Sequence, residues 1–332
     1  MNAAAISPRG GVSPRGTLLR GQSIIEYVLI IAVIGLVIVF AGPGVAGAIR
    51  NQFNLVGNTV NNGTTGGVGG GASGGGSAGV ESATVQAAIA KDAKDWTLDE
   101  QKAVAEDIAK NGTSSVVYAK AKAAMDAGTT WSIKLTNGKT LEYKIIGINH
   151  DDLADGSGKA GLTFLTTSTG IISRMNSTAT NAGGWEKSEL RQKMNSGEIW
   201  NLMPSDLQCK VKTVKKLSNN ISGKDKNAAV TATSDRLFLL SHSEIVSISY
   251  WVFYLPWTSS EGTQYDAFKG KVTNNRGSND CLVVGDPHSW WQRSVNPYGS
   301  ASFLTVGRRG DPSENGGAED WYTYCVCPAW CF

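Results

Sequence analysis

One carboxylate stands inside the longest apolar segment of the chain. Glu26 lies near the start of the run from Ile24 to Ile49, in which Val28 to Ala41 are all apolar apart from Gly35. This run is long enough to cross a bilayer as one helix, which takes about 20 residues. A charge in such a segment costs about 2.5–3.5 kcal/mol on insertion scales, so a carboxylate kept there indicates a specific role.

The residues around this carboxylate resemble a known processing site. The chain reads Arg20-Gly21-Gln22-Ser23-Ile24-Ile25-Glu26-Tyr27. This order resembles the N-terminus of type IV pilins, and the Glu26-Tyr27 pair is most similar to the small Flp subfamily of tight-adherence (Tad) pili. The resemblance implies that a prepilin peptidase cleaves between Gly21 and Gln22. It also implies filament assembly with other pilin subunits, in which Glu26 pairs with the free amine of a neighbouring Gln22 and leaves no unpaired charge in the apolar core.

A second interpretation of the same segment remains open. It is an ordinary signal anchor, or a signal peptide cleaved near Ala46-Gly47-Ala48. That interpretation leaves Glu26 unexplained, and the apolar run is longer than a usual signal-peptide core.

The distribution of charge favours a membrane-inserted precursor. The leader carries Arg9, Arg15 and Arg20 without an acidic residue, and the whole chain has a formal net charge of +3. The basic excess therefore belongs to the cytoplasmic leader, as the positive-inside rule requires. We expect everything after Arg50 to lie outside the cell, and we expect no nucleic-acid partner.

All five cysteines fall in the last part of the chain, at Cys209, Cys281, Cys325, Cys327 and Cys331. Outside the cell an even set would indicate disulfides, but the odd count leaves at least one thiol free or paired between chains. A zinc site from the last three cysteines and a fourth ligand is one alternative. Buried thiols beside the core are the interpretation that we favour, with no metal and no cofactor.

Histidines and carboxylates show no catalytic pattern. Asn149-His150-Asp151-Asp152 and Asp155-Gly156-Ser157-Gly158 form an oxygen-rich loop, but its spacing is not that of a calcium loop, so a structural turn is favoured. His242 reads as part of a turn or helix cap, and His288 precedes a pair of tryptophans. We therefore predict that the protein is not an enzyme, although spacing alone leaves a Cys-His nucleophile pair open.

Composition divides the chain into five parts. After the leader (1–21) and the apolar helix (22–50), residues 51–79 form a linker that contains much of the chain's glycine and cannot bury a core. Residues 80–128 have apolar residues at helical spacing and a capping-box signal at Thr97 and Glu100, so they predict a helical stalk with helices ending near Gly112 and Gly128.

Residues 129–332 predict a separate α+β domain. Trp131 to Leu135, the turn Asn137-Gly138 and Leu141 to Ile145 indicate a β-hairpin. Gly184 to Asn195 has helical spacing, Ser205 to Leu217 suggests a second short helix, and Arg236 to Leu240 suggests a buried strand.

Several segments of this domain resemble an uncharacterised bacterial surface domain with a C-type-lectin fold. Some relatives of that domain are variable proteins of diversity-generating retroelements. The segments are Gly184 to Arg191, Thr233 to Ser241, Glu261 to Tyr265, Trp290-Trp291-Gln292-Arg293-Ser294 and Val326 to Phe332. Relatives more often have Leu at position 292 and Gly at position 325. Formylglycine-generating oxidases share the general scaffold, but their active-site context is not found in this chain.

The stretch between the tryptophan pair and the C-terminus predicts a ligand-binding surface. Trp290, Trp291 and Arg293 look like framework, whereas the following loops mix Tyr, Trp and Arg with Ser, Gly and Asn, which is the composition of a paratope. We predict ligand contacts at Val295, Asn296, Tyr298, Ser300, Ser302, Arg308, Arg309, Asp311, Ser313, Glu314, Asn315, Glu319, Asp320, Trp321, Tyr322 and Tyr324. We expect Tyr298, Arg308, Arg309, Trp321 and Tyr322 on one contiguous face.

A second aromatic cluster, Tyr250 to Trp257, allows two interpretations, a buried strand or an exposed patch. Together these features lead to the hypothesis of a pilus-associated surface adhesin. Its lectin-fold domain, which a retroelement could diversify, binds an external protein or glycan. The alternatives are a structural minor pilin without a ligand and an extracellular enzyme.

Overall fold

The computed structural model describes residues 82–221, 229–247, 255–272, 277–285, 288–320 and 324–332. These residues belong to one compact unit. The predicted leader, apolar helix and linker lie outside the described residues, as do Gly21, Gln22, Glu26 and Tyr27.

The predicted fold class needs a correction. The α+β part of the prediction agrees with the structure, but the N-terminal hydrophobic pilin helix is not supported, because no helix among the described residues is long and apolar enough to span a membrane. Helix α4 (Leu98–Asn111) has 14 residues. At 1.5 Å per residue it extends about 21 Å, short of a hydrocarbon core of about 30 Å.

Among the described residues, three α-helices precede the first strand. Helix α3 (Ala83–Ala90) is capped by the Ser82 side chain, and α4 begins at the predicted capping box, in which Thr97 and Glu100 bond each other's backbone. Helix α4 ends at Gly112, and α5 (Tyr118–Ala127) ends at Gly128 in the left-handed conformation, as predicted. Short 3-10 helices η1 (Ala93–Asp95) and η2 (Gly112–Ser114) connect them.

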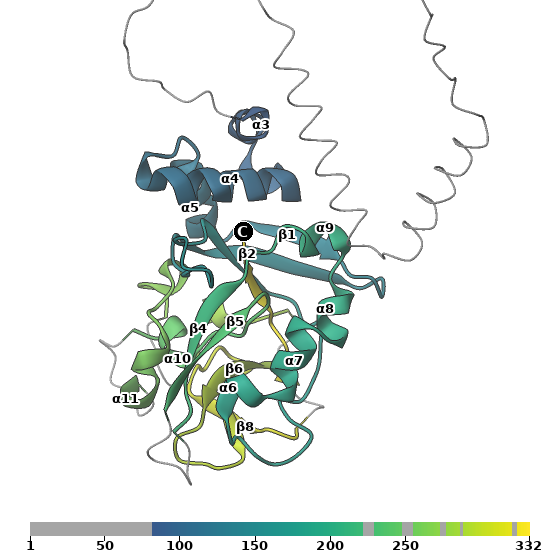
Figure 1. Cartoon of the computed structure of the whole chain (residues 1–332), viewed down its shortest axis with the longest axis vertical. Helices are drawn as coiled ribbons and strands as arrows, with labels where there is room; N and C mark the ends of the chain where they lie inside the picture. The colour runs from purple at the N-terminus through teal and green to yellow at the C-terminus, as the bar shows by residue number, and fades with distance from the viewer. Residues whose placement is uncertain (1–81, 222–228, 248–254, 273–276, 286–287, 321–323) are drawn as a thin grey trace, which may run out of the picture. The chain divides into compact units, whose positions relative to one another are not determined.

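The first sheet has four strands in the order β1-β2-β3-β10. These are β1 (Thr130–Lys134), β2 (Thr140–Ile148), β3 (Leu162–Thr166) and β10 (Ala329–Cys331). The predicted hairpin is the antiparallel β1–β2 pair, and Gly138 takes a positive φ of 85° in its turn. Strand β10 pairs with β3, so the end of the chain closes the sheet. Helices α4 and α5 lie against this sheet, and α3 packs on α4 (Figure 1). Buried residues of all three helices belong to the same hydrophobic core as the sheet.

Short helices and a two-stranded sheet follow β3. The helices are α6 (Gly184–Lys187), α7 (Glu189–Asn195), α8 (Glu198–Leu202) and α9 (Ser205–Gln208). The segment Ser205 to Leu217, which the sequence suggested as a second short helix, contains the one-turn helix α9, and strand β4 begins at Val214. The small sheet pairs β4 (Val214–Asn219) with β5 (Val230–Asp235) in antiparallel register. Leu237 to Leu240, part of the segment predicted as a buried strand, are buried but belong to none of the strands of the described sheets. Their backbone bonds neighbouring strands through the bridge from Phe238 to Ala329 and through the Leu240 carbonyl, which accepts from the Arg293 N–H at 2.9 Å.

The last part of the chain forms a second four-stranded sheet in the order β8-β7-β6-β9. Its strands are β6 (Ser289–Val295), β7 (Ser302–Val306), β8 (Glu314–Gly317) and β9 (Tyr324–Cys325). Ahead of it come α10 (His242–Ile245), α11 (Leu255–Thr258), η3 (Ser259–Glu261), η4 (Asp266–Phe268) and η5 (Asp280–Leu282). The framework residues Trp290, Trp291 and Arg293 are buried in β6, as the sequence indicates.

Candidate functional site

The predicted ligand contacts lie at the two ends of strand β7. The loop of residues 296–301 enters the strand, and the loop of residues 307–313 leaves it. Five residues of β-strand span roughly 14 Å from the first to the last Cα, at about 3.4 Å per residue. The structure therefore separates Tyr298 from Arg308 and Arg309, which we expected on one face.

We call the first group the tyrosine end: Trp257, residues 296–301 and residues 318–320. Asn181 holds its loop, because the Asn181 amide donates to the carbonyls of Gly299 (3.0 Å) and Ser302 (2.9 Å). The Asn181 backbone N–H also donates to the Ser300 carbonyl at 3.0 Å. Tyr298 projects from this loop with 58% of its surface exposed. Because hydrogen bonds hold the backbone of this loop, the exposed ring of Tyr298 is preorganised for binding.

Trp257 and the acidic turn complete the tyrosine end. The Trp257 indole N–H donates to the Tyr298 hydroxyl at 3.4 Å. The backbone of Ala318 bonds the Ala301 carbonyl at 2.8 Å, which places the exposed residues Glu319 and Asp320 beside the same loop. The tyrosine end thus combines aromatic rings with two carboxylates.

We call the second group the arginine end: residues 307–315. Its backbone is held by the buried Asn279, which bonds the carbonyls of Arg309 (3.1 Å) and Gly310 (3.0 Å). The Pro312 carbonyl accepts from the buried side chains of His242 (3.0 Å) and Gln292 (2.7 Å).

These contacts leave Arg308 and Arg309 exposed on a fixed loop, together with Glu314 and Asn315 at the start of β8. Asp311 and Ser313 are half-buried in the same loop. Both signs of charge are therefore present, so this end does not present a purely basic surface.

Some predicted contacts are not at the surface. Val295 is 4% exposed and Asn296 is 8% exposed, because Val295 packs in the core and Asn296 holds its own loop through Ser302 and the Tyr298 backbone. Tyr324 is half-buried and lies against Trp291, with ring centroids 4.4 Å apart. Trp321 and Tyr322 lie outside the described residues.

A buried group of charges lies under the tyrosine end. We call it the ionic core; its members are Asp151, Lys216, Glu244, Glu261 and Arg293, each at most 4% exposed. Lys216 Nζ lies 2.7 Å from Asp151 Oδ1 and 2.5 Å from Glu244 Oε1. Arg293 Nη1 lies 2.5 Å from Glu244 Oε2.

The charges of the ionic core set its pKa values. Burial alone would raise the pKa of Glu244, but the charges of Arg293 and Lys216 outweigh it and hold that pKa below its ordinary value. The same competition lowers the pKa of Asp151, with Lys216 as its main opposite charge. Glu261 behaves differently: burial raises its pKa to about 7, although the charge of Arg293 and hydrogen bonds from Ser294 and Asn219 oppose the rise.

The cysteines and the oxygen-rich loop show no metal-binding arrangement in the described part of the chain. All five cysteines are free thiols there, and Cys325, Cys327 and Cys331 are buried. Burial raises the pKa of Cys327 and Cys331 well above its ordinary value, so these thiols stay protonated. Among the described residues no group of three His, Cys, Asp or Glu side chains could hold a metal ion.

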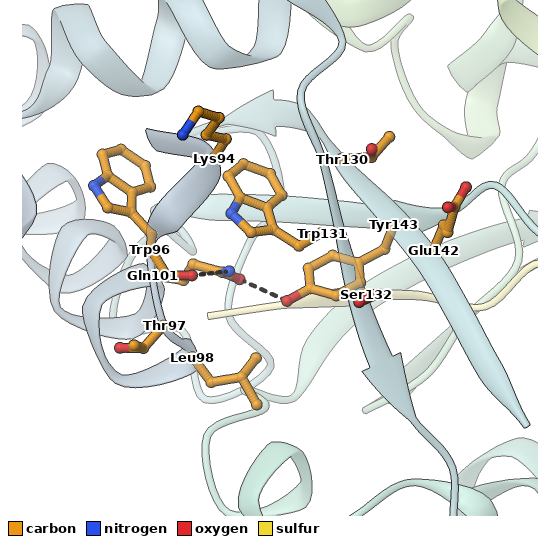
Figure 2. Close-up of a pocket in the computed structure, with 10 residues that line it drawn as sticks. All are labelled: Lys94, Trp96, Thr97, Leu98, Gln101, Thr130, Trp131, Ser132, Glu142 and Tyr143. Atoms are coloured by element: carbon orange, nitrogen blue, oxygen red, sulfur yellow. Dashed lines mark hydrogen bonds between the residues drawn. The ribbon is translucent and has the colours of Figure 1, made fainter. Parts of the chain in front are cut away.

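A shallow pocket of about 400 Å³ opens where the helices meet the edge of the first sheet (Figure 2). Its floor contains Trp96 and Trp131, whose nearly parallel rings have centroids 6.4 Å apart. Both indole N–H groups bond backbone carbonyls, of Ala88 (2.9 Å) and Ala93 (3.0 Å). The Tyr143 hydroxyl bonds Gln101 at 3.1 Å. The indole of Trp131 and the hydroxyl of Tyr143 are therefore engaged in attaching the helical segment to the sheet, and the indole of Trp96 holds α3.

Residues 160–331 match the model of a family described as a domain of unknown function, DUF6273. The chain belongs to the DUF6273 family. No curated protein and no solved structure matches the chain. The DUF6273 region begins just before β3 and contains both ends of β7 and every residue of the ionic core except Asp151.

Sequence reasoning found some functional features of the DUF6273 region and missed others. It singled out Arg293 through the Trp290–Ser294 motif. It did not find Asn181, Asn219 or Asn279, because a single asparagine at the end of an element or in a loop carries no pattern that distinguishes a side chain that holds the backbone from a solvated one.

Proposed function

We propose that the DUF6273 domain is the recognition domain of a surface adhesin, and that it binds an external protein or glycan through the tyrosine end. The observation that carries this proposal is Tyr298, which is 58% exposed on a loop held by Asn181. Tyrosine supplies a large, amphipathic contact with few rotatable bonds, so little conformational entropy is lost when it binds. Such aromatic anchors dominate the energetics of many interfaces.

The surroundings of Tyr298 support the same proposal. Trp257 lies beside it, and Glu319 and Asp320 supply exposed hydrogen-bond acceptors at the same end of β7. A rigid aromatic contact next to adaptable polar groups is typical of a binding surface. Because the backbone is already held in place, binding needs little ordering of the loop.

The proposal is tested by probing the full chain against an array of immobilised glycans and extracellular proteins. We expect wild type to bind a subset, and Tyr298→Ala to lose about 2 kcal/mol of affinity, or about 30-fold in Kd. The matched control is Val116→Ala, since Val116 is 54% exposed but lies among the N-terminal helices. We expect this control to bind as wild type does.

Two outcomes would contradict the proposal. One is that wild type binds nothing on the array, as a structural protein without a ligand would do. The other is that Tyr298→Ala binds normally while the double substitution of Arg308 and Arg309 by Ala abolishes binding. That result would assign recognition to the arginine end.

A further inference from the structure

The ionic core contains one more carboxylate than it has cations. Asp151, Glu244 and Glu261 are its acids, and Lys216 and Arg293 are its bases. If all five were ionised, the core would hold one excess negative charge without access to water. Burying an unpaired charge is costly, so one of the carboxylates is expected to hold a proton.

The contacts identify Glu261 as that carboxylate. Asp151 and Glu244 each lie within 2.7 Å of a cationic side chain. The Glu261 carboxylate instead bonds the backbone N–H of Asn219 at 2.9 Å and the hydroxyl of Ser294. Arg293 reaches only the backbone carbonyl of Glu261, at 2.7 Å. Both partners donate, the Asn219 N–H to Oε1 and the Ser294 hydroxyl to Oε2. Both oxygens of a protonated carboxyl group keep a lone pair, so a proton on Glu261 removes the excess charge and leaves both contacts in place.

Asn219 connects this carboxyl group to the tyrosine end. Its backbone N–H donates to Glu261, and its side-chain amide donates to the carbonyl of Trp257. The Trp257 indole in turn reaches the Tyr298 hydroxyl. Helix α11 and η3 are consecutive, so Trp257 and Glu261 belong to one short segment that is attached to β4 and β6 through these bonds.

We propose that Glu261 is a pH-sensitive lock that holds the segment of residues 255–261, and with it Trp257, in place at the tyrosine end. The protonated lock keeps the segment bonded to Asn219 and Ser294. Ionisation places the excess negative charge in the core and favours opening of the segment. The consequence for recognition rests on the proposed function, because it assumes that Trp257 and Tyr298 bind the ligand together.

Every charged neighbour of Glu261 bears on this lock. Arg293 reaches Glu261 from β6, and the charge of Glu244 acts on it from α10. Lys216 on β4 contacts Glu244, and His242 on α10 bonds Ser294 through its backbone N–H at 2.9 Å. Farther along the same network are Asp151, His150 and Tyr265, whose hydroxyl lies 2.9 Å from both oxygens of Asp151. Arg293 favours the ionised form of Glu261, whereas Glu244 opposes it.

The direction of the pH effect follows from linkage. An exposed Glu ionises near pH 4.5, whereas burial raises the pKa of Glu261 to about 7 in the closed state. The equilibrium constant for opening of the segment therefore rises roughly tenfold per pH unit as pH increases from about 4.5 to about 7. Above about pH 7 it no longer changes, because Glu261 is then ionised in both states.

Amide hydrogen exchange of the full chain between pH 5 and pH 8.5, corrected for the intrinsic pH dependence of exchange, measures this opening. We expect protection of residues 255–261 to fall roughly tenfold per pH unit up to about pH 7 and then to level off. Helix α4 should show no such change. Glu261→Gln removes the titrating proton while its amide oxygen can still accept one of the two hydrogen bonds, so protection should be independent of pH.

Two further variants sharpen the test. Glu314→Gln removes another carboxyl with a raised pKa, at the arginine end, and should leave the profile of residues 255–261 unchanged. Ser294→Ala removes a hydrogen bond that favours the ionised form of Glu261, so it should raise the pKa of Glu261 further. The pH above which protection of residues 255–261 stops falling should then be higher than in wild type.

A flat profile in wild type overturns the proposal, and so does a wild-type profile retained in Glu261→Gln. If Glu261→Gln does not fold, the wild-type and Ser294→Ala profiles decide the matter. Hydrogen exchange needs no ligand, so this result stands apart from the array experiment. If hydrogen exchange shows the pH-dependent opening but wild type binds nothing on the array, only the proposed function is refuted.

Discussion

Arg293 and Glu244 form a bidentate ion pair in the interior of the DUF6273 domain. Two guanidinium nitrogens of Arg293 lie 2.5 and 3.0 Å from the two oxygens of Glu244. The remaining donors bond the carbonyls of Leu217, Leu239 and Glu261 at 2.7–3.0 Å. All five N–H donors of the guanidinium are thereby used, and they join β4, β6, α10 and η3 at one point.

The first prediction concerns this pair. Arg293→Met should destabilise the protein by about 3–5 kcal/mol, because it leaves a buried carboxylate short of its main cation. Combining it with Glu244→Gln should recover part of the loss, since both charges are then removed. Urea unfolding measures each free energy. The control is Lys102→Ala, which breaks a surface pair with Glu106 and should change stability by at most about 0.5 kcal/mol. An Arg293→Met protein as stable as wild type would show that the pair does not organise the core.

The second prediction separates framework from binding surface. Trp291 has no exposed surface, and its indole N–H bonds the Ser173 carbonyl at 2.8 Å. Trp291→Ala should therefore cost about 3–5 kcal/mol through the cavity it opens. Tyr298→Ala should cost about 0.5 kcal/mol or less, because most of its ring is exposed. Thermal melting of the two variants checks both values. If Tyr298→Ala lowered the melting temperature and Trp291→Ala did not, Tyr298 would belong to the framework and Trp291 would not, contrary to the prediction.

The third prediction concerns acid stability. Burial lowers the pKa of His242 to about 4, although its hydrogen bond to the Pro312 carbonyl opposes the shift. In the unfolded chain the same imidazole takes a proton below about pH 6.5. The unfolded state therefore binds more protons in this interval, and stability falls as pH drops from about 6.5 to about 4.

His242→Gln should remove this part of the acid sensitivity, because a neutral amide can still donate to Pro312. Urea unfolding between pH 4.5 and pH 7.5 gives the comparison. Glu261 acts in the opposite sense over nearly the same interval, since its raised pKa favours the folded state as pH falls towards 4.5. The difference between wild type and His242→Gln isolates the histidine. Parallel curves for the two proteins would contradict the prediction.

Local patterns predicted the elements that depend on neighbouring residues. The capping box at Thr97, the glycine ends of α4 and α5 and the Asn137-Gly138 hairpin all agree with the structure. These features arise from hydrogen bonds and dihedral angles within a few residues, which a single stretch of sequence specifies. The sequence also predicted that Trp290, Trp291 and Arg293 belong to the framework, because they stand together in one short motif, and all three are buried.

Only the tertiary structure decided which of the predicted contacts are available and what lies beneath them. The sequence by itself determined an α+β domain with a polar and aromatic C-terminal stretch. It could not show that Tyr298 and Arg308 lie at opposite ends of β7, or that Val295 is buried in the core. Nor could it assemble Asp151, Lys216, Glu244, Glu261 and Arg293 into one buried group. Their separations along the chain are long, and contacts of that kind follow from packing rather than from local pattern.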